Sequence, residues 1–178
     1  MEKKSYRSSA INYGVYLALG LSAFTIIGYA VSLELLTNFW FYLLILPLTS
    51  IAVGVISTAK AKSILGGFIS FKDAFSAYFI TIAIAMIISS LVSIVIFNFI
   101  DPEAATTIQE IVMEKTRTFM ENMGAPESEI DKAMEQAANQ DNLGISAQIY
   151  NIAKGLIFYA VIGLIVGLIM KKKDPDAA

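Results

Sequence analysis

The sequence predicts an all-α protein: a four-helix transmembrane bundle with an extramembrane amphipathic helical hairpin between the third and fourth spans. Three observations favour this fold class. Of the 178 residues, 56% are hydrophobic and only 16% are charged, whereas an ordinary soluble domain has about 25% charged residues. The apolar residues gather in four long, nearly uncharged segments. The one long polar segment between them has apolar residues at helical spacing.

Each of the four apolar segments is long enough to cross a bilayer as a helix. A bilayer core of about 30 Å requires about 20 apolar residues. The predicted spans are residues 12–33, 38–59, 74–100 and 152–170. The first three carry no charge and the fourth carries only Lys154. Because these segments lack the polar face of a soluble core helix, we predict that all four lie in the membrane.

The distribution of basic residues predicts how the spans are oriented. Nine of the 13 Lys and Arg residues lie before the first span, between the second and third, or after the fourth: Lys3, Lys4, Arg7, Lys60, Lys62, Lys72, Lys171, Lys172 and Lys173. The positive-inside rule places these residues in the cytoplasm. We therefore predict a multi-pass protein of the bacterial inner membrane with both termini cytoplasmic. Residues 1–100 then hold spans one to three, with a cytoplasmic link at 60–73.

The segment at residues 101–147 is predicted to be an acidic periplasmic helical hairpin. It carries ten acidic and three basic residues. Asp101 followed by Pro102 is a helix-start signal, because Asp is a good N-cap and Pro fits the first helical position. Gly124 is a natural helix stop, and Pro126 opens a second helix. Residues 148–178 follow as the fourth transmembrane helix and a basic cytoplasmic tail.

The apolar face of this hairpin has two interpretations. It either caps the mouth of the bundle or docks a partner protein, for which methionine is an adaptable side chain. The candidate docking residues are Met113, Phe119, Met120, Met123, Ile130 and Met134. The acidic charge of the hairpin argues against simple adsorption to anionic lipid.

Small residues recur at a spacing of four in every span, which lets helices approach closely in lipid. The candidate packing glycines are Gly14, Gly54, Gly163 and Gly167. The last two form a GxxxG pair that serves packing either within the chain or between chains, and we favour the first.

The link between the second and third spans is expected to lie at the membrane surface. Its basic residues Lys60, Lys62 and Lys72 alternate with apolar ones, so we expect them to meet anionic lipid headgroups. Its Gly66-Gly67 pair is also compatible with a phosphate site, because glycines free backbone amides.

Composition and charge placement exclude several classes of chemistry. The chain has no cysteine and no histidine, which rules out disulfides, Cys/His zinc sites, Ser-His-Asp triads and cysteine nucleophiles. Its formal net charge of −2 is unlike that of nucleic-acid-binding proteins. The centres of the spans contain no Asp, Glu or Arg, whereas proton-coupled transporters usually place an ionisable group there. We therefore expect no cofactor and no nucleic-acid partner.

Five stretches of the sequence resemble one known family. These are residues 10–14 (AINYG), 62–75 (KSILGGFISFKDAF), 97–102 (FNFIDP), 124–127 (GAPE) and 171–173 (KKK). On these motifs the chain resembles the Bacteroidetes membrane proteins of domain-of-unknown-function family 4199. The resemblance covers nearly the whole chain and implies a four-span inner-membrane protein. It implies no catalytic residues, because the family has no established activity.

These observations lead to three functional hypotheses. We favour a non-enzymatic accessory or scaffold subunit, embedded among membrane lipids, that docks a protein partner through the periplasmic helical segment. The alternative is a homo-oligomeric small transporter or lipid-handling protein of the cell envelope. The third is an enzyme acting on a lipid headgroup through Asp101 and Glu103; with Asn98, the same two carboxylates are also compatible with a divalent cation.

Overall fold

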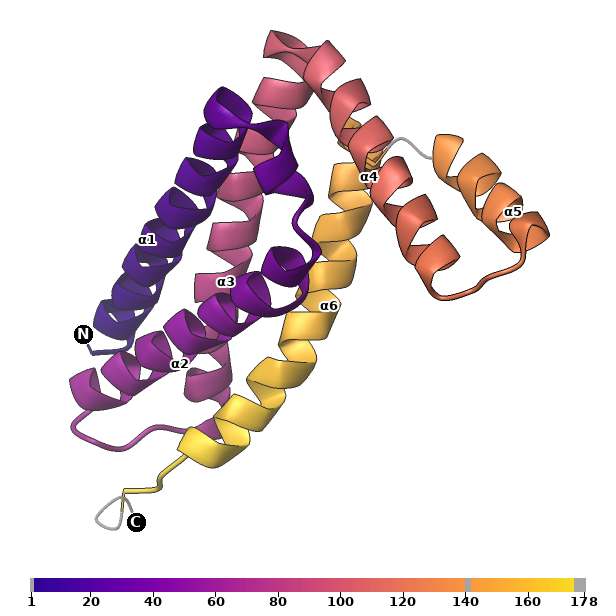
Figure 1. Ribbon diagram of the computed structural model, residues 1–178. Coiled ribbons are helices and arrows are strands. Elements are labelled where there is room, and N and C mark those ends of the chain that lie inside the picture. Colours follow the sequence, from indigo (N-terminus) through magenta and orange to yellow (C-terminus); the bar gives the residue numbers. More distant parts are fainter. Residues whose placement is uncertain (1, 140–141, 175–178) are drawn as a thin grey trace.

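The computed structural model describes residues 2–139 and 142–174, and the described residues are almost entirely helical (Figure 1). The α-helices are α1 (Glu2–Val31), α2 (Leu46–Ile64), α3 (Phe71–Ile94), α4 (Pro102–Asn122), α5 (Glu127–Ala138) and α6 (Ile145–Met170). The described residues also form a 3-10 helix, η1 (Leu33–Thr37), and two π-helical turns, η2 (Phe41–Ile45) and η3 (Val95–Ile100). The all-α prediction is confirmed.

Four helical segments are long and apolar enough to cross a membrane: Ser5–Val31, Phe41–Ile64, Phe71–Ile100 and Ile145–Met170. Helix α3 is the centre of their bundle, since it packs against α1, α2 and α6. Helices α4 and α5 extend to one side of this bundle (Figure 1). Helix α4 also contacts η1 and η3, so it is joined to the ends of two spans.

The observed helices extend beyond the predicted spans. Helix α1 begins before residue 12 because Tyr6 and Ala10 are buried in a cluster with Ala61 and Ala74. The link at 60–73 is shorter than predicted, because α2 runs to Ile64 and α3 begins after its N-cap Ser70. Helix α6 begins at Ile145 rather than at 148.

Two spans contain a π-helical turn near the same end of the bundle. In η2, the backbone N–H of Leu46 bonds to the carbonyl oxygen of Phe41, five residues earlier. Pro47 follows in the first turn of α2, where its missing N–H is tolerated. In η3, the N–H of Asp101 bonds to the oxygen of Ile96 at 2.8 Å. The helix is thus irregular just before Pro47, where it forms a π-helical turn.

Glycines allow the helices of the bundle to approach closely. A methyl group at Gly14 would lie 2.9 Å from the carbonyl oxygen of Thr81 in α3. The ring of Tyr78 lies between α2 and α6: a methyl group at Gly54 or Gly163 would lie 2.5 or 2.8 Å from one of its ring carbons. A methyl group at Gly167 would lie 3.1 Å from ring carbons of Phe71. All four predicted packing glycines therefore lie against α3 of the same chain.

Buried hydroxyl groups add polar contacts between three helices. The oxygens of Thr81 and Ser57 are 2.7 Å apart, and Thr81 Oγ1 is 3.1 Å from the carbonyl oxygen of Ala10. Both hydroxyl-bearing residues are fully buried. Such bonds satisfy polar groups inside an apolar bundle and fix the register of α1, α2 and α3.

Candidate functional site

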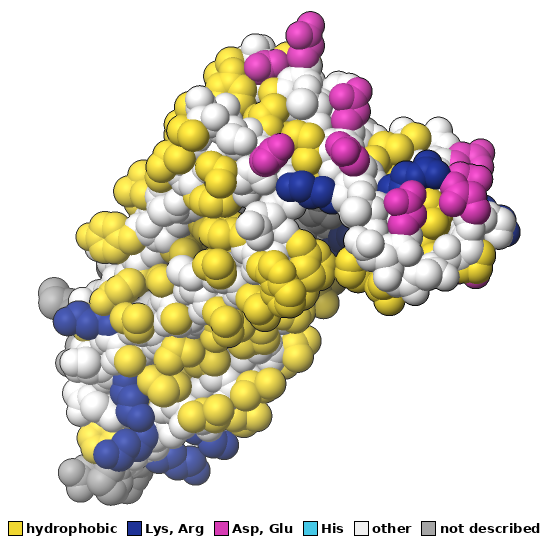
Figure 2. Space-filling model, in the orientation of Figure 1, with side chains coloured by type: hydrophobic (Ala, Val, Ile, Leu, Met, Phe, Trp, Pro, Cys, Tyr) yellow, Lys and Arg dark blue, Asp and Glu magenta, His cyan; other side chains and the backbone are white. Residues whose placement is uncertain are grey.

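Charged side chains gather at opposite ends of the bundle, with a largely hydrophobic band between them (Figure 2). The basic end comprises Arg7, Lys60, Lys62, Lys72, Lys171, Lys172 and Lys173. The acidic end comprises η1, η3, α4 and α5. Lys3 and Lys4 belong to the same predicted basic group, but the structure describes only their backbone and not their side chains. This separation of charge along the bundle is the pattern that a bilayer imposes.

Contacts between the link and the chain's end hold the basic end together. Ile69 and Lys172 exchange two backbone hydrogen bonds of 3.0 and 2.9 Å. Lys62 Nζ donates to the carbonyl oxygen of Met170 at 3.0 Å, at the C-terminus of α6, where a cation is favoured. Lys60 and Lys72 are exposed. Lys62 therefore has a partner within the chain, whereas the side chains of Lys60 and Lys72 extend from the surface.

The Gly66-Gly67 pair forms a tight turn after α2. The two residues have φ angles of +74° and +89°, which glycine adopts at no steric cost. The N–H of Gly67 bonds to the carbonyl oxygen of Lys62 at 2.9 Å, as expected at the end of a helix. The turn geometry alone thus accounts for both glycines.

At the acidic end, Asp101 and Asn98 make structural hydrogen bonds. Asp101 Oδ1 accepts from the N–H of Ala104 at 3.0 Å, and its Oδ2 accepts from the Tyr29 hydroxyl at 3.2 Å. Asn98 Nδ2 donates to the carbonyl oxygen of Leu143 at 3.0 Å. Within residues 2–139 and 142–174, no group of three or more Asp and Glu side chains lies close enough together to hold a metal ion. Asp101 thus joins α1 to the start of α4.

Helices α4 and α5 pack on each other through Ile130, which is only 1% exposed. Gln109 Nε2 donates to the carbonyl oxygen of Ala137 at 3.1 Å. Arg117 bonds to Glu121 at 2.9 Å and to Glu127 at 2.5 Å, and these partners raise its pKa above the ordinary value. The prediction that Ile130 faces a partner needs correction, because its side chain is enclosed within the α4–α5 pair.

An apolar stripe runs along the exposed face of α4. It consists of Val112, Thr116, Phe119 and Met123, whose spacing places them on one face of the helix. Val112, Phe119 and Met123 are 42%, 61% and 71% exposed. We call these four residues the α4 stripe. Phe119 and Met123 are among the candidate docking residues, whereas Val112 and Thr116 are not in that set.

The remaining candidate methionines are less exposed than Phe119 and Met123. Met113, Met120 and Met134 are half-buried. Met113 lines a cleft of about 710 Å³ between the α4–α5 pair and the bundle, and Val112 and Thr116 of the α4 stripe line the same cleft. Figure 2 shows a hollow at this place. Lys115 Nζ donates to Thr37 Oγ1 at 2.7 Å, which ties α4 to η1.

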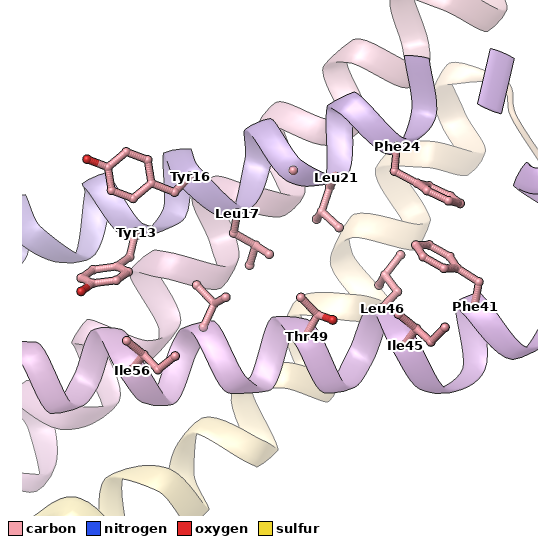
Figure 3. A pocket seen from close by; sticks show the side chains of 12 residues that line it. Tyr13, Tyr16, Leu17, Leu21, Phe24, Phe41, Ile45, Leu46, Thr49 and Ile56 are labelled. Atoms are coloured by element: carbon pink, nitrogen blue, oxygen red, sulfur yellow. The ribbon is translucent and has the colours of Figure 1, made fainter. Parts of the chain in front are cut away.

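A second, apolar groove lies on the side of the bundle between α1 and α2 (Figure 3). Its volume is about 530 Å³. One end is closed by the stacked rings of Phe24 and Phe41, whose centres are 3.8 Å apart. Tyr13 and Tyr16 lie at the other end, and Thr49 points into the gap (Figure 3).

The fold and these charged ends define the class: this is a multi-pass helical membrane protein with four membrane-length helices. A family model described as protein of unknown function (DUF4199) matches residues 12–172. The chain belongs to that family. A significant match was found neither to a curated protein nor to a solved structure.

Proposed function

We propose that this protein is a non-enzymatic accessory or scaffold subunit of the bacterial inner membrane that docks a partner protein through α4. The observation that carries the proposal is the α4 stripe, whose Val112, Phe119 and Met123 are exposed on a helix that is otherwise rich in charge. Large apolar side chains grouped on one exposed face are typical of an interaction surface. Their spacing is that of anchor residues in helix-mediated recognition.

The charge distribution supports an orientation for this surface. Under the positive-inside rule the basic end, with both termini, lies in the cytoplasm. The α4–α5 pair then forms an extramembrane hairpin on the periplasmic side. Residues 101–147 carry ten acidic and three basic residues, so anionic headgroups repel the hairpin. A protein partner therefore fits the α4 stripe better than the lipid surface does.

The glycine contacts favour a subunit over a homo-oligomeric transporter or lipid-handling protein. The alternative was motivated by the GxxxG pair of the fourth span. Gly163 lies against Tyr78 and Phe75, and Gly167 lies against Phe71. Because these aromatic residues belong to α3 of the same chain, the pair is already used within one bundle.

Site-specific photo-crosslinking tests the proposal. Thr116 lies on the α4 stripe and is exposed, so p-benzoylphenylalanine at this position should cross-link a different protein in native membranes. Adding Phe119→Asp and Met123→Asp should lower the yield of this adduct at least tenfold.

The matched control places Thr118→Asp and Asn122→Asp on the neighbouring, exposed face of α4 and should keep the yield. Circular dichroism and a monodisperse elution profile verify that each variant folds. Adducts only to lipid or to a second copy of this chain would contradict the proposal, as would equal yields in the two double variants.

A further inference from the structure

The groove between α1 and α2 is independent of the proposed docking function. We infer that it binds one acyl chain of an anionic phospholipid from the leaflet at the basic end, with the lipid phosphate held by Lys60. Three features carry this inference: the apolar lining of the groove, its length and the position of Lys60.

The lining of the groove suits a hydrocarbon chain. Leu17 and Leu21 of α1 point into it from one side, and Ile45 of η2 and Leu46 of α2 lie on the other side (Figure 3). Gly20 widens the groove, since a methyl group added there would meet nothing within 4 Å. A flexible acyl chain fills such an irregular space, whereas leaving it empty would forfeit packing contacts.

The α1 wall of the groove is about as long as half of the bilayer core. This wall runs from Tyr13 to Phe24, which is about 16 Å at about 1.5 Å per residue. Half of a bilayer core about 30 Å thick is about 15 Å. The Phe24–Phe41 stack closes the groove toward the acidic end. A chain that enters from the basic end therefore stops at this stack, which lies near the acidic end of the second membrane-length segment, Phe41–Ile64.

Lys60 is placed to bind the headgroup of that lipid. The groove face of α2 includes Thr49, Val53 and Ile56, and helical spacing puts Lys60 on the same face one turn further on. Lys60 is exposed. Tyr13 lies at this end of the groove (Figure 3), where an amphipathic ring suits the membrane interface. A lysine ammonium favours a lipid of net negative charge over a zwitterionic one.

Lipid retention measures the chain-binding part of the inference. The protein is reconstituted into nanodiscs of phosphatidylethanolamine and phosphatidylglycerol, extracted gently and analysed by native mass spectrometry. We expect one retained phosphatidylglycerol. Gly20→Leu fills the groove and should reduce retention at least fivefold. The control Ala23→Leu adds the same side chain at an exposed position of α1 and should leave retention unchanged. Equal retention in these two variants would overturn the inference.

The headgroup part has its own matched pair. Lys60→Gln should lower the ratio of retained phosphatidylglycerol to phosphatidylethanolamine at least threefold. Lys173→Gln removes the same charge from another exposed site at the basic end and should not change the ratio. Equal ratios in the two variants would overturn the assignment of Lys60.

A measurement on the unmodified chain covers the case in which Gly20→Leu does not fold. Phosphatidylglycerol with a diazirine on its acyl chain should label peptides from residues 13–24 and 41–56 above the rest of the spans. Uniform labelling of the four spans would overturn the inference. None of these variants changes the α4 stripe, so the outcome is separate from that of the docking experiment.

Discussion

Single residues set the distances between the helices, and Tyr78 shows this most clearly. A methyl group at Gly54 would lie 2.5 Å from a carbon of its ring. We expect Gly54→Ala to lower the free energy of unfolding by about 1–3 kcal/mol, because either the ring or α2 must move. Gly20→Ala is the control, since a methyl group there meets nothing within 4 Å. Thermal denaturation in detergent checks this; equal midpoints for the two variants would contradict it.

Asp101 provides a second test with a single residue. Its carboxylate caps α4 at the N–H of Ala104 and accepts a hydrogen bond from Tyr29. Asp101→Ala should destabilise the start of α4 by about 1 kcal/mol, whereas Asp101→Asn should preserve most of the cap. Hydrogen exchange in the first turn of α4 reports the difference. If both variants exchange like the original protein, Asp101 is not the cap that holds this helix.

The sequence predicts which helices exist better than it predicts the residues at which they begin and end. All four spans are visible as long apolar stretches with at most one charged residue, because a bilayer requires such stretches. That criterion stops at the first charge, and so it misses that α2 continues through Lys60 and Lys62 to Ile64. The helix start at Asp101 and the stop near Gly124 follow from local residue chemistry. Pro47 is a local signal for an irregularity near η2, whereas the residues of η3 carry no such signal.

The α4–α5 pair is predicted to depend on one buried side chain. Ile130 is 1% exposed, so Ile130→Ala should weaken the packing of α5 on α4 by about 2–5 kcal/mol. Proteolysis in the turn between the two helices should become faster while the four spans remain protected. Lys132→Ala, at an exposed position of α5, serves as the control. Identical cleavage of the two variants would mean that Ile130 does not hold the pair together.

For the whole molecule, the orientation in the membrane can be tested directly because the chain has no cysteine. Ser63 at the basic end and Ser128 in α5 are both exposed. In spheroplasts, a membrane-impermeant maleimide should label Ser128→Cys, and it should label Ser63→Cys only after permeabilisation. The separation of charge in Figure 2 is the physical reason. The reverse pattern would place the α4–α5 pair in the cytoplasm.

Some properties of the whole molecule lie beyond single-sequence reasoning. The sequence identifies Gly163 and Gly167 as packing residues, but only the three-dimensional arrangement shows that Phe71, Phe75 and Tyr78 occupy their face. Likewise, Ile130 and Met123 look equivalent as apolar residues of an amphipathic hairpin, yet one is buried and the other exposed. These differences arise from long-range contacts, which helical periodicity does not encode.

The most direct test of the docking function is the native mass of the protein after gentle extraction from its own membranes into nanodiscs. The α4 stripe predicts this chain in a stoichiometric complex with a different protein, and the complex should dissociate when Phe119 and Met123 are both replaced by Asp. A clean homo-oligomer, or a single chain with lipid alone, would contradict the role of an accessory subunit.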